Sequence, residues 1–109
     1  MIKQNPKQRQ TIEIELPEEI AEGIYANFIV ISHSNAEFIF DFIRVTPQAR
    51  KTTVKTRVIM APQNVKSLFH ALQQNIQQYE KSHGEIPSQE GQESPFGLAV
   101  KIPDDLLPN

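Results

Sequence analysis

A long amphipathic pattern between Pro62 and about Ser82 dominates the second half of the chain. Its apolar residues recur mainly at intervals of three and four, which places them in one stripe along a helix. The opposite face carries lysine, serine, histidine and glutamine, and Gly84 is well placed to end the helix. We therefore predict a helix whose stripe is buried against the rest of the domain. The stripe consists of Val65, Leu68, Phe69, Leu72, Ile76 and Tyr79.

Four stretches before this helix have the pattern of β-strands. The first alternates apolar residues with glutamates, as in a strand with one solvated face, and the other three are rich in β-branched and aromatic residues. A single helical turn is expected over residues 18–22, between the first two. Turn residues at Asn35 and Pro47 make the later connections short, which favours antiparallel hairpins. The four predicted strands are 11–16, 24–34, 37–45 and 53–61.

These elements predict an α+β fold, a four-stranded antiparallel sheet (β-β-β-β-α) packed by one long C-terminal helix. Residues 1–10 are polar and are expected to form a flexible N-terminal arm. Residues 11–84 are expected to form a single α+β domain. Residues 85–109 have the composition of a linker and C-terminal tail, in which 96–102 alternates like a short docking strand.

The second and third predicted strands carry more apolar surface than one helix can cover. Both of their faces are apolar, whereas an antiparallel sheet with a solvated face shows polar residues there. A second copy of the chain is the simplest way to cover the remaining apolar face, so we expect a homo-oligomer, either a dimer or a tetramer. The alternative is that the tail segment 96–102 covers this face.

Composition narrows the classes of function. The 109 residues contain no cysteine, which excludes disulfides, thiolate nucleophiles and cysteine-built zinc sites. The four glycines are isolated, so there is no glycine-rich phosphate loop. No apolar run approaches the roughly 18–20 residues of a membrane span, and the start lacks a hydrophobic signal core. We expect a soluble cytoplasmic protein without a cofactor and without a membrane partner.

Charge is segregated along the chain although the net charge is only −2. No acidic residue occurs between Asp41 and Glu80, and seven acids with no lysine or arginine occupy residues 13–41. The basic residues either balance the acids of the same fold or form a patch for an anionic partner. The candidate patch is Arg44, Arg50, Lys51, Lys55, Arg57 and Lys66.

Other constellations favour structural roles. Ser32, His33 and Ser34 place hydroxyls beside an imidazole, but turn-capping serines at a strand end explain them better than catalysis. His33 and His70 would need Asp41 or Glu37 to converge on them to hold a metal. We assign no catalytic, cofactor-binding or metal-binding residue and do not expect an enzyme.

Three phenylalanines alternate along one predicted strand, at Phe38, Phe40 and Phe42. They are typical of the core beneath the helix. The alternative is a platform on which the bases of single-stranded nucleic acid stack, beside Lys55 and Arg57.

Ordered sequence blocks resemble a known family. The block from Ile14 to Phe28, then Ile-Ser-His-Ser at 31–34, Asp-Phe-Ile-Arg-Val at 41–45 and Val-Ile-Met-Ala-Pro at 58–62 are similar to a bacterial and archaeal family, domain of unknown function 3467 (DUF3467). The likeness spans about residues 12–82, and it implies no activity because the family is uncharacterised. Its usual Thr-Pro helix start is Ala61-Pro62 here.

A shorter likeness concerns the junction between the last strand and the helix. Residues 60–69, Met-Ala-Pro-Gln-Asn-Val-Lys-Ser-Leu-Phe, are similar to the same junction in the bacterial export chaperones with the SecB-like fold. That likeness implies antiparallel strands followed by a long helix, assembled into oligomers.

Two functional hypotheses follow from the sequence. The first is an oligomeric protein-interaction module of a chaperone-like kind, with apolar grooves and an unidentified protein partner. The second is a single-stranded nucleic-acid-binding module that uses the basic patch. The negative net charge of the chain disfavours the nucleic-acid hypothesis, because contacts between cations and phosphates supply most non-specific affinity for nucleic acid.

Overall fold

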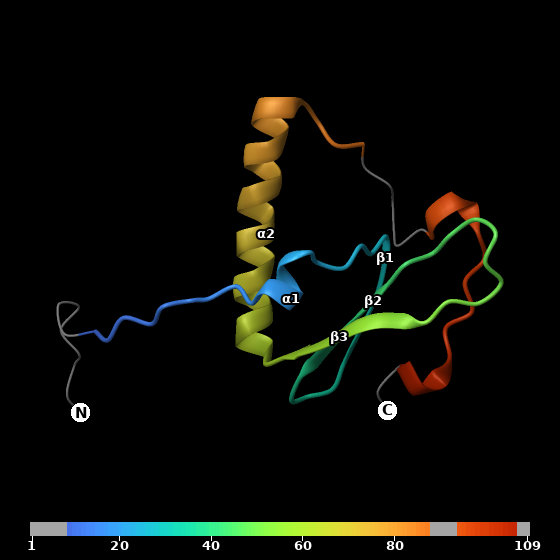
Figure 1. The fold of residues 1–109 in the computed structure, drawn as a ribbon, viewed down its shortest axis with the longest axis horizontal. Coiled ribbons are helices and arrows are strands. Elements are labelled where there is room, and N and C mark those ends of the chain that lie inside the picture. The colour runs from blue at the N-terminus through green and yellow to red at the C-terminus, as the bar shows by residue number, and fades with distance from the viewer. Residues whose placement is uncertain (1–8, 88–93, 107–109) are drawn as a thin grey trace.

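A computed structural model of the chain describes residues 9–87 and 94–106. It is an α+β structure with one antiparallel sheet in the order β1-β2-β3 and one main helix, α2 (Figure 1). The short helix α1 precedes the sheet, and two 3₁₀ turns lie in the tail. The elements are α1 (Glu18–Ala21), β1 (Phe28–His33), β2 (Phe38–Ile43), β3 (Val54–Met60), α2 (Pro62–His83), η2 (Pro95–Gly97) and η3 (Asp104–Leu106).

The β1–β2 hairpin forms where the turn residues predict it. The Ser34 amide donates to the Glu37 carbonyl at 2.9 Å, and the Ser34 hydroxyl oxygen accepts from the amides of Ala36 and Glu37. A serine side chain that binds the backbone two and three residues ahead stabilises a tight turn. The turn fixes the register in which Ile31 lies opposite Phe40.

Pairing of the strands separates their side chains into two faces, because residues directly opposite each other share a face. One face, here called the phenylalanine face, consists of Ile29, Ile31, His33, Phe38, Phe40, Phe42, Thr56, Val58 and Met60. The other, here called the tail face, consists of Phe28, Val30, Ser32, Ile39, Asp41, Ile43, Val54, Arg57 and Ile59. A register shift between Phe42 and Ile43 leaves Lys55 without a partner residue on β2.

The buried apolar cluster lies on the tail face. Val30, Ile43 and Val45 form it, with Phe28 and Val54 packed at its edge and Leu98 of the tail against it. Asn27 closes this end of the sheet: its Nδ2 donates to the Val45 carbonyl at 2.8 Å, and its Oδ1 accepts from the Val45 amide at 2.7 Å. The tail therefore docks on the sheet, through 3₁₀ turns and extended chain rather than through the strand predicted over 96–102.

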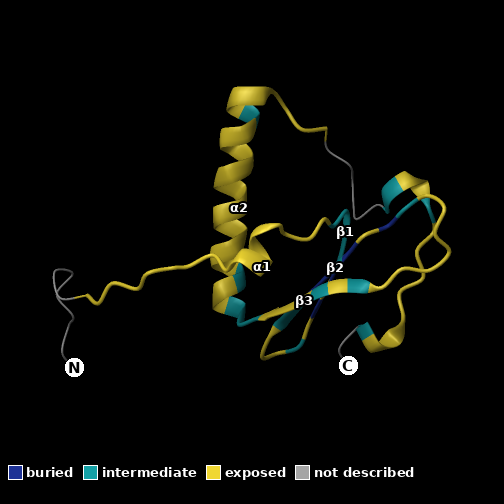
Figure 2. Cartoon of the chain, in the orientation of Figure 1, coloured by how far each residue is buried: buried dark blue, intermediate teal, exposed yellow. Residues whose placement is uncertain are grey.

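Helix α2 has the predicted limits but not the predicted packing. Pro62 starts it, and Gly84 follows it with φ of 90°. No residue of α2 is buried, and Leu72, expected in the core, is 55% exposed. Figure 1 shows α2 standing beside the sheet, and Figure 2 shows it exposed over most of its length. The prediction that the helix packs with its stripe buried against the sheet is wrong, because the single linking residue, Ala61, is extended and α2 stands beside the sheet.

The predicted fourth strand is also absent from the sheet. Residues 11–16 are extended chain outside any strand, and Ile14 is 94% exposed (Figure 1). The sheet thus has three strands rather than four, with β1 and β3 as its edges. An alternating segment forms a strand only when a neighbouring strand supplies hydrogen bonds, and within the described residues none does so for 11–16.

The helical turn expected over residues 18–22 is present as α1, where the amides of Ile20 and Ala21 donate to the Pro17 carbonyl. Gly23, with φ of 75°, ends it. Of the helices that the structure describes, none combines the length and the apolarity needed to cross a bilayer.

Phe40 on the central strand should be the most costly apolar side chain to truncate on the phenylalanine face, because it is only 6% exposed. Phe40→Ala should lower the free energy of unfolding by about 3–5 kcal/mol, as a cavity replaces the ring. Phe40→Leu, which keeps most of the volume, should lower it much less. Chemical denaturation at one fixed protein concentration measures both, and equal losses would contradict this placement.

Candidate interaction surfaces

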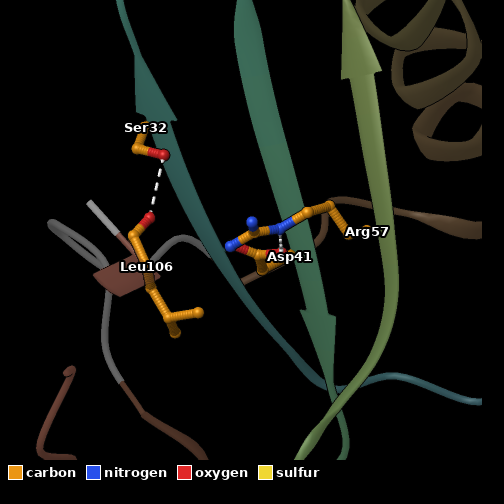
Figure 3. Close-up of polar contacts among 4 residues, drawn as sticks. All are labelled: Ser32, Asp41, Arg57 and Leu106. Carbon is orange, nitrogen blue, oxygen red and sulfur yellow. Dashed lines mark hydrogen bonds and ion pairs between the residues drawn. The ribbon is translucent and has the colours of Figure 1, made fainter. Parts of the chain in front are cut away.

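The strongest polar contact of the sheet joins Asp41 on β2 to Arg57 on β3. Arg57 Nε donates to Asp41 Oδ1 at 2.6 Å, and Nη2 donates to Oδ2 at 3.0 Å (Figure 3). The Asp41 side chain has no exposed surface. A buried carboxylate is tolerated because a bidentate guanidinium satisfies both of its oxygens.

The pKa of Arg57 is raised above its already high ordinary value, mainly because the side chain donates hydrogen bonds to Asp41. The charges of Asp41 and of Asp105 in the tail add to this effect, and desolvation opposes it. A raised pKa stabilises the folded state at every pH below the ordinary value, and the guanidinium stays protonated there. Arg57 is therefore a permanent cation that pairs with Asp41 and leaves 41% of its side chain exposed.

The structure divides the six residues of the predicted basic patch. Arg57 belongs to the tail face and pairs with Asp41, and Lys66 lies on α2. Arg44, Lys51 and Lys55 line one hollow of about 390 Å³ at the loop between β2 and β3, together with three threonines and Ala49. Arg50 lines a second hollow beneath the tail. The patch is thus reduced to three cations around one hollow.

Hydroxyls and cations line the first hollow, and no acidic side chain lines it. Its lining threonines are Thr46, Thr52 and Thr53, and the Thr52 hydroxyl donates to the Arg44 carbonyl at 2.7 Å. The Arg44 guanidinium lies over the Tyr25 ring, 5.8 Å from its centroid. Hydroxyls and cations around one hollow suit a small anion, but nothing within it is enclosed enough to define a catalytic centre.

Ser32 and His33 point to opposite faces of β1. The Ser32 hydroxyl donates to the Leu106 carbonyl of the tail at 3.1 Å (Figure 3), whereas the His33 ring stacks on Phe38 with centroids 5.2 Å apart. Ser34 caps the turn. The three residues therefore do not form a nucleophile with a base.

A metal site built on His33 and Asp41 is likewise divided by the sheet, since His33 is on the phenylalanine face and Asp41 on the tail face. Across residues 9–87 and 94–106, no group of three or more histidine or acidic side chains is placed to hold a metal ion.

The phenylalanine row differs from a base-stacking platform in its charge surroundings. Phe40 is buried, Phe38 and Phe42 are half-buried, and Phe38 and Phe40 stack with centroids 6.5 Å apart. The predicted neighbour Arg57 lies on the other face, and Lys55 occupies the register shift. The paired strand residues of the phenylalanine face include no lysine or arginine, and Arg44 follows β2 directly after Ile43.

Apolar surface remains uncovered on three parts of the described chain. On the α2 stripe Phe69, Leu72 and Tyr79 are more than half exposed, Leu68 and Ile76 are about two-fifths exposed, and Val65 is partly covered. Ile31 and Val58 on the phenylalanine face are 49% and 38% exposed. Before β1 lies a run of exposed large residues: Ile12, Ile14, Leu16, Ile20, Ile24 and Tyr25. Exposed apolar side chains of this kind make the three regions candidates for contact with another polypeptide.

Sequence reasoning missed the Asp41–Arg57 pair. The available signal was a single acid inside the apolar run Phe-Ile-Phe-Asp-Phe-Ile at 38–43. Such a position is expected to be buried, and a buried carboxylate requires a cation as its partner. Sequence reasoning also left open whether the tail docks, although Leu98 and Leu106 now lie on the tail face.

The comparisons with known proteins agree with the sequence blocks quoted above. The model of the family described as "Protein of unknown function (DUF3467)" matches residues 1–88, whereas the docked tail lies beyond the match. No curated protein matches, and no solved structure matches. Because the match covers most of the 109 residues, the chain belongs to the DUF3467 family.

Proposed function

We propose that the chain is a homo-oligomeric protein-interaction module that binds extended polypeptide segments in the manner of a chaperone. The observation that carries the proposal is the α2 stripe, an apolar helix face with no buried residue. A helix of this kind gains most of its stability from packing of its apolar face, so a partner surface is required.

The dimensions of the protomer support assembly. Its accessible surface is 10343 Å², whereas a compact monomer of 12.4 kDa exposes about 6,100 Å². Its radius of gyration is 18.1 Å, against about 13 Å for a compact domain of this length. Exposed apolar side chains of the α2 stripe, such as Phe69 and Leu72, contribute to this excess.

A second copy is the occupant that fits. In our proposal the α2 stripe of one protomer packs across the phenylalanine face of its partner, and the reverse contact closes a symmetric dimer. Both surfaces are apolar, and α2 joins β3 through one residue that prevents the same contact within a protomer. The finer architecture is part of this proposal: segment 11–16 would add to a sheet edge as the fourth strand of a β-β-β-β-α, SecB-like arrangement.

A second candidate, a single-stranded nucleic-acid-binding module, is favoured by one observation. Arg44, Lys51 and Lys55 surround a hollow without an acidic residue in its lining. Three cations make few phosphate contacts, and the paired strand residues of the phenylalanine face include no lysine or arginine. The interaction module is therefore the better-supported function.

Assembly is tested with charge substitutions on α2. Leu72→Asp should reduce the mass measured by light scattering at micromolar concentration to that of one protomer, because a carboxylate in the interface is left unpaired. Gln74→Asp adds the same charge on the polar face of the helix and should leave the mass unchanged. A wild-type chain that is already monomeric would exclude the proposed assembly.

The proposed mating surface is tested separately with two neighbouring residues of β3. Val58→Asp, on the phenylalanine face, should dissociate the oligomer, whereas Ile59→Asp, on the tail face, should not. Binding of a permanently unfolded, carboxymethylated probe protein to the wild-type oligomer tests the chaperone-like part. Absence of binding at a large excess of module would reject that part while leaving the assembly intact.

Nucleic-acid binding is tested by mobility shift at low salt with a single-stranded oligonucleotide. We expect no retardation by the wild-type chain. Retardation that disappears in the triple variant Arg44→Gln, Lys51→Gln, Lys55→Gln but persists in Lys66→Gln would favour the second candidate, because Lys66 lies on α2 away from the hollow.

A further inference from the structure

The tail face already holds an extended polypeptide segment, which is the chain's own tail. Residues 94–106 run from η2 to η3 along this face, beyond the part of the chain that the family model matches. Leu98 packs against the cluster of Val30, Ile43 and Val45. The chemistry of the tail therefore indicates what kind of segment this face accepts.

Polar groups fix the other end of the tail. The Ser32 hydroxyl donates to the Leu106 carbonyl, a backbone contact that any residue can make (Figure 3). The charge of Asp105 adds to the effects that raise the pKa of Arg57, whose guanidinium is paired with Asp41 on the same face. The face thus combines an apolar contact at Leu98 with, seven and eight positions later along the occupant, a cation for Asp105 and a backbone contact at Leu106.

The tail fills this face incompletely. A hollow of about 680 Å³ remains between the sheet, the loop after β2 and the tail, lined by Phe28, Leu98 and Ile102 among others. Phe96 has φ of 61°, a backbone conformation that costs a non-glycine residue energy, and its side chain is 60% exposed. No strand pairing secures residues 94–106. The unfilled hollow, the unfavourable backbone of Phe96 and the absence of strand pairing indicate that the tail is bound weakly for its length.

We propose that the tail face is a polypeptide-binding groove in which residues 94–106 are a resident, displaceable occupant. The clients it fits are extended segments with a large apolar residue followed, about seven residues later, by a carboxylate for Arg57. This inference rests on the proposed protein-interaction function and adds its site, its client class and its regulation. Since the tail is tethered, it competes at an effective concentration on the order of millimolar, so only clients that bind well displace it.

The groove is tested with the full chain and a fluorescent synthetic peptide of sequence 94–106, by anisotropy. In the wild-type protein the tail occupies the site and the peptide binds weakly. Leu98→Asp removes the apolar contact of the resident tail, so the peptide should bind about tenfold tighter or more. Phe96→Asp places the same charge on an exposed residue of the same tail and should behave as the wild type.

A second variant that releases the tail controls for the possibility that Leu98→Asp disturbs the fold. Asp105→Lys alters an exposed residue, repels the tail from Arg57, and should also tighten binding of the unaltered peptide. If neither Leu98→Asp nor Asp105→Lys binds the peptide more tightly than the wild type, the resident tail is not a competitor and the proposal is overturned.

The carboxylate preference is tested on the peptide alone. On the Leu98→Asp protein, a peptide with Asp105→Asn should bind several-fold more weakly than the unaltered peptide. Equal affinities would overturn the assigned client class.

Failure of this inference is distinguishable from failure of the proposed function. Leu98→Asp should keep the oligomer mass of the wild type, since Leu98 lies on the tail face. Binding of the unfolded probe protein without any tail competition would reject the resident-occupant role alone. Loss of probe binding in every variant, with the peptide results as expected, would instead reject the broader chaperone-like function.

Discussion

The bidentate contact between Asp41 and Arg57 is the constraint on which the register of the sheet depends. A slip of one residue between β2 and β3 would turn Arg57 to the opposite face of the sheet and leave the buried Asp41 carboxylate opposite Thr56 or Val58. A slip of two would keep it on the tail face but leave it buried without its guanidinium. Each alternative costs the desolvation of a charge, so one register is selected over its neighbours.

This selection explains how a sheet that is apolar on both faces can have a defined structure. Apolar pairs such as Ile31 with Phe40 are tolerant of substitution by one another, and they specify register weakly. The charged pair is specific, and the hydrogen bonds of Asn27 to Val45 fix the end of β1 against the end of β2. The sheet therefore keeps one pairing although both of its faces are largely apolar.

Local features of the structure could be predicted from the sequence, and long-range contacts could not. The helix from Pro62, its end at Gly84, the turn at Ser34 and the antiparallel hairpins follow from capping, turn chemistry and periodicity, which act within a few residues. The α2 stripe was located correctly, but periodicity identifies an apolar face without identifying what covers it. The same limit applies to residues 11–16, whose alternation carries no information about the strand that would pair with them. The sequence predicts a basic patch only from the clustering of cations along the chain. Strand pairing decides which cations lie together, and it joins Arg57 to Asp41 while Arg44 lines a separate hollow.

The junction at Ala61 has a mechanical consequence. Proline at position 62 restricts the residue before it to extended backbone, and Ala61 has φ of −68° and ψ of 151°. Helix α2 is therefore a stiff rod of 22 residues, about 33 Å long, whose direction depends on the two backbone dihedral angles of Ala61. A rotation of about 10° at Ala61 would move the far end of the helix by about 6 Å, a distance that follows from the rise per residue. The backbone dihedral angles of a single alanine thus set the reach of the whole helix, and proline limits how far they can vary.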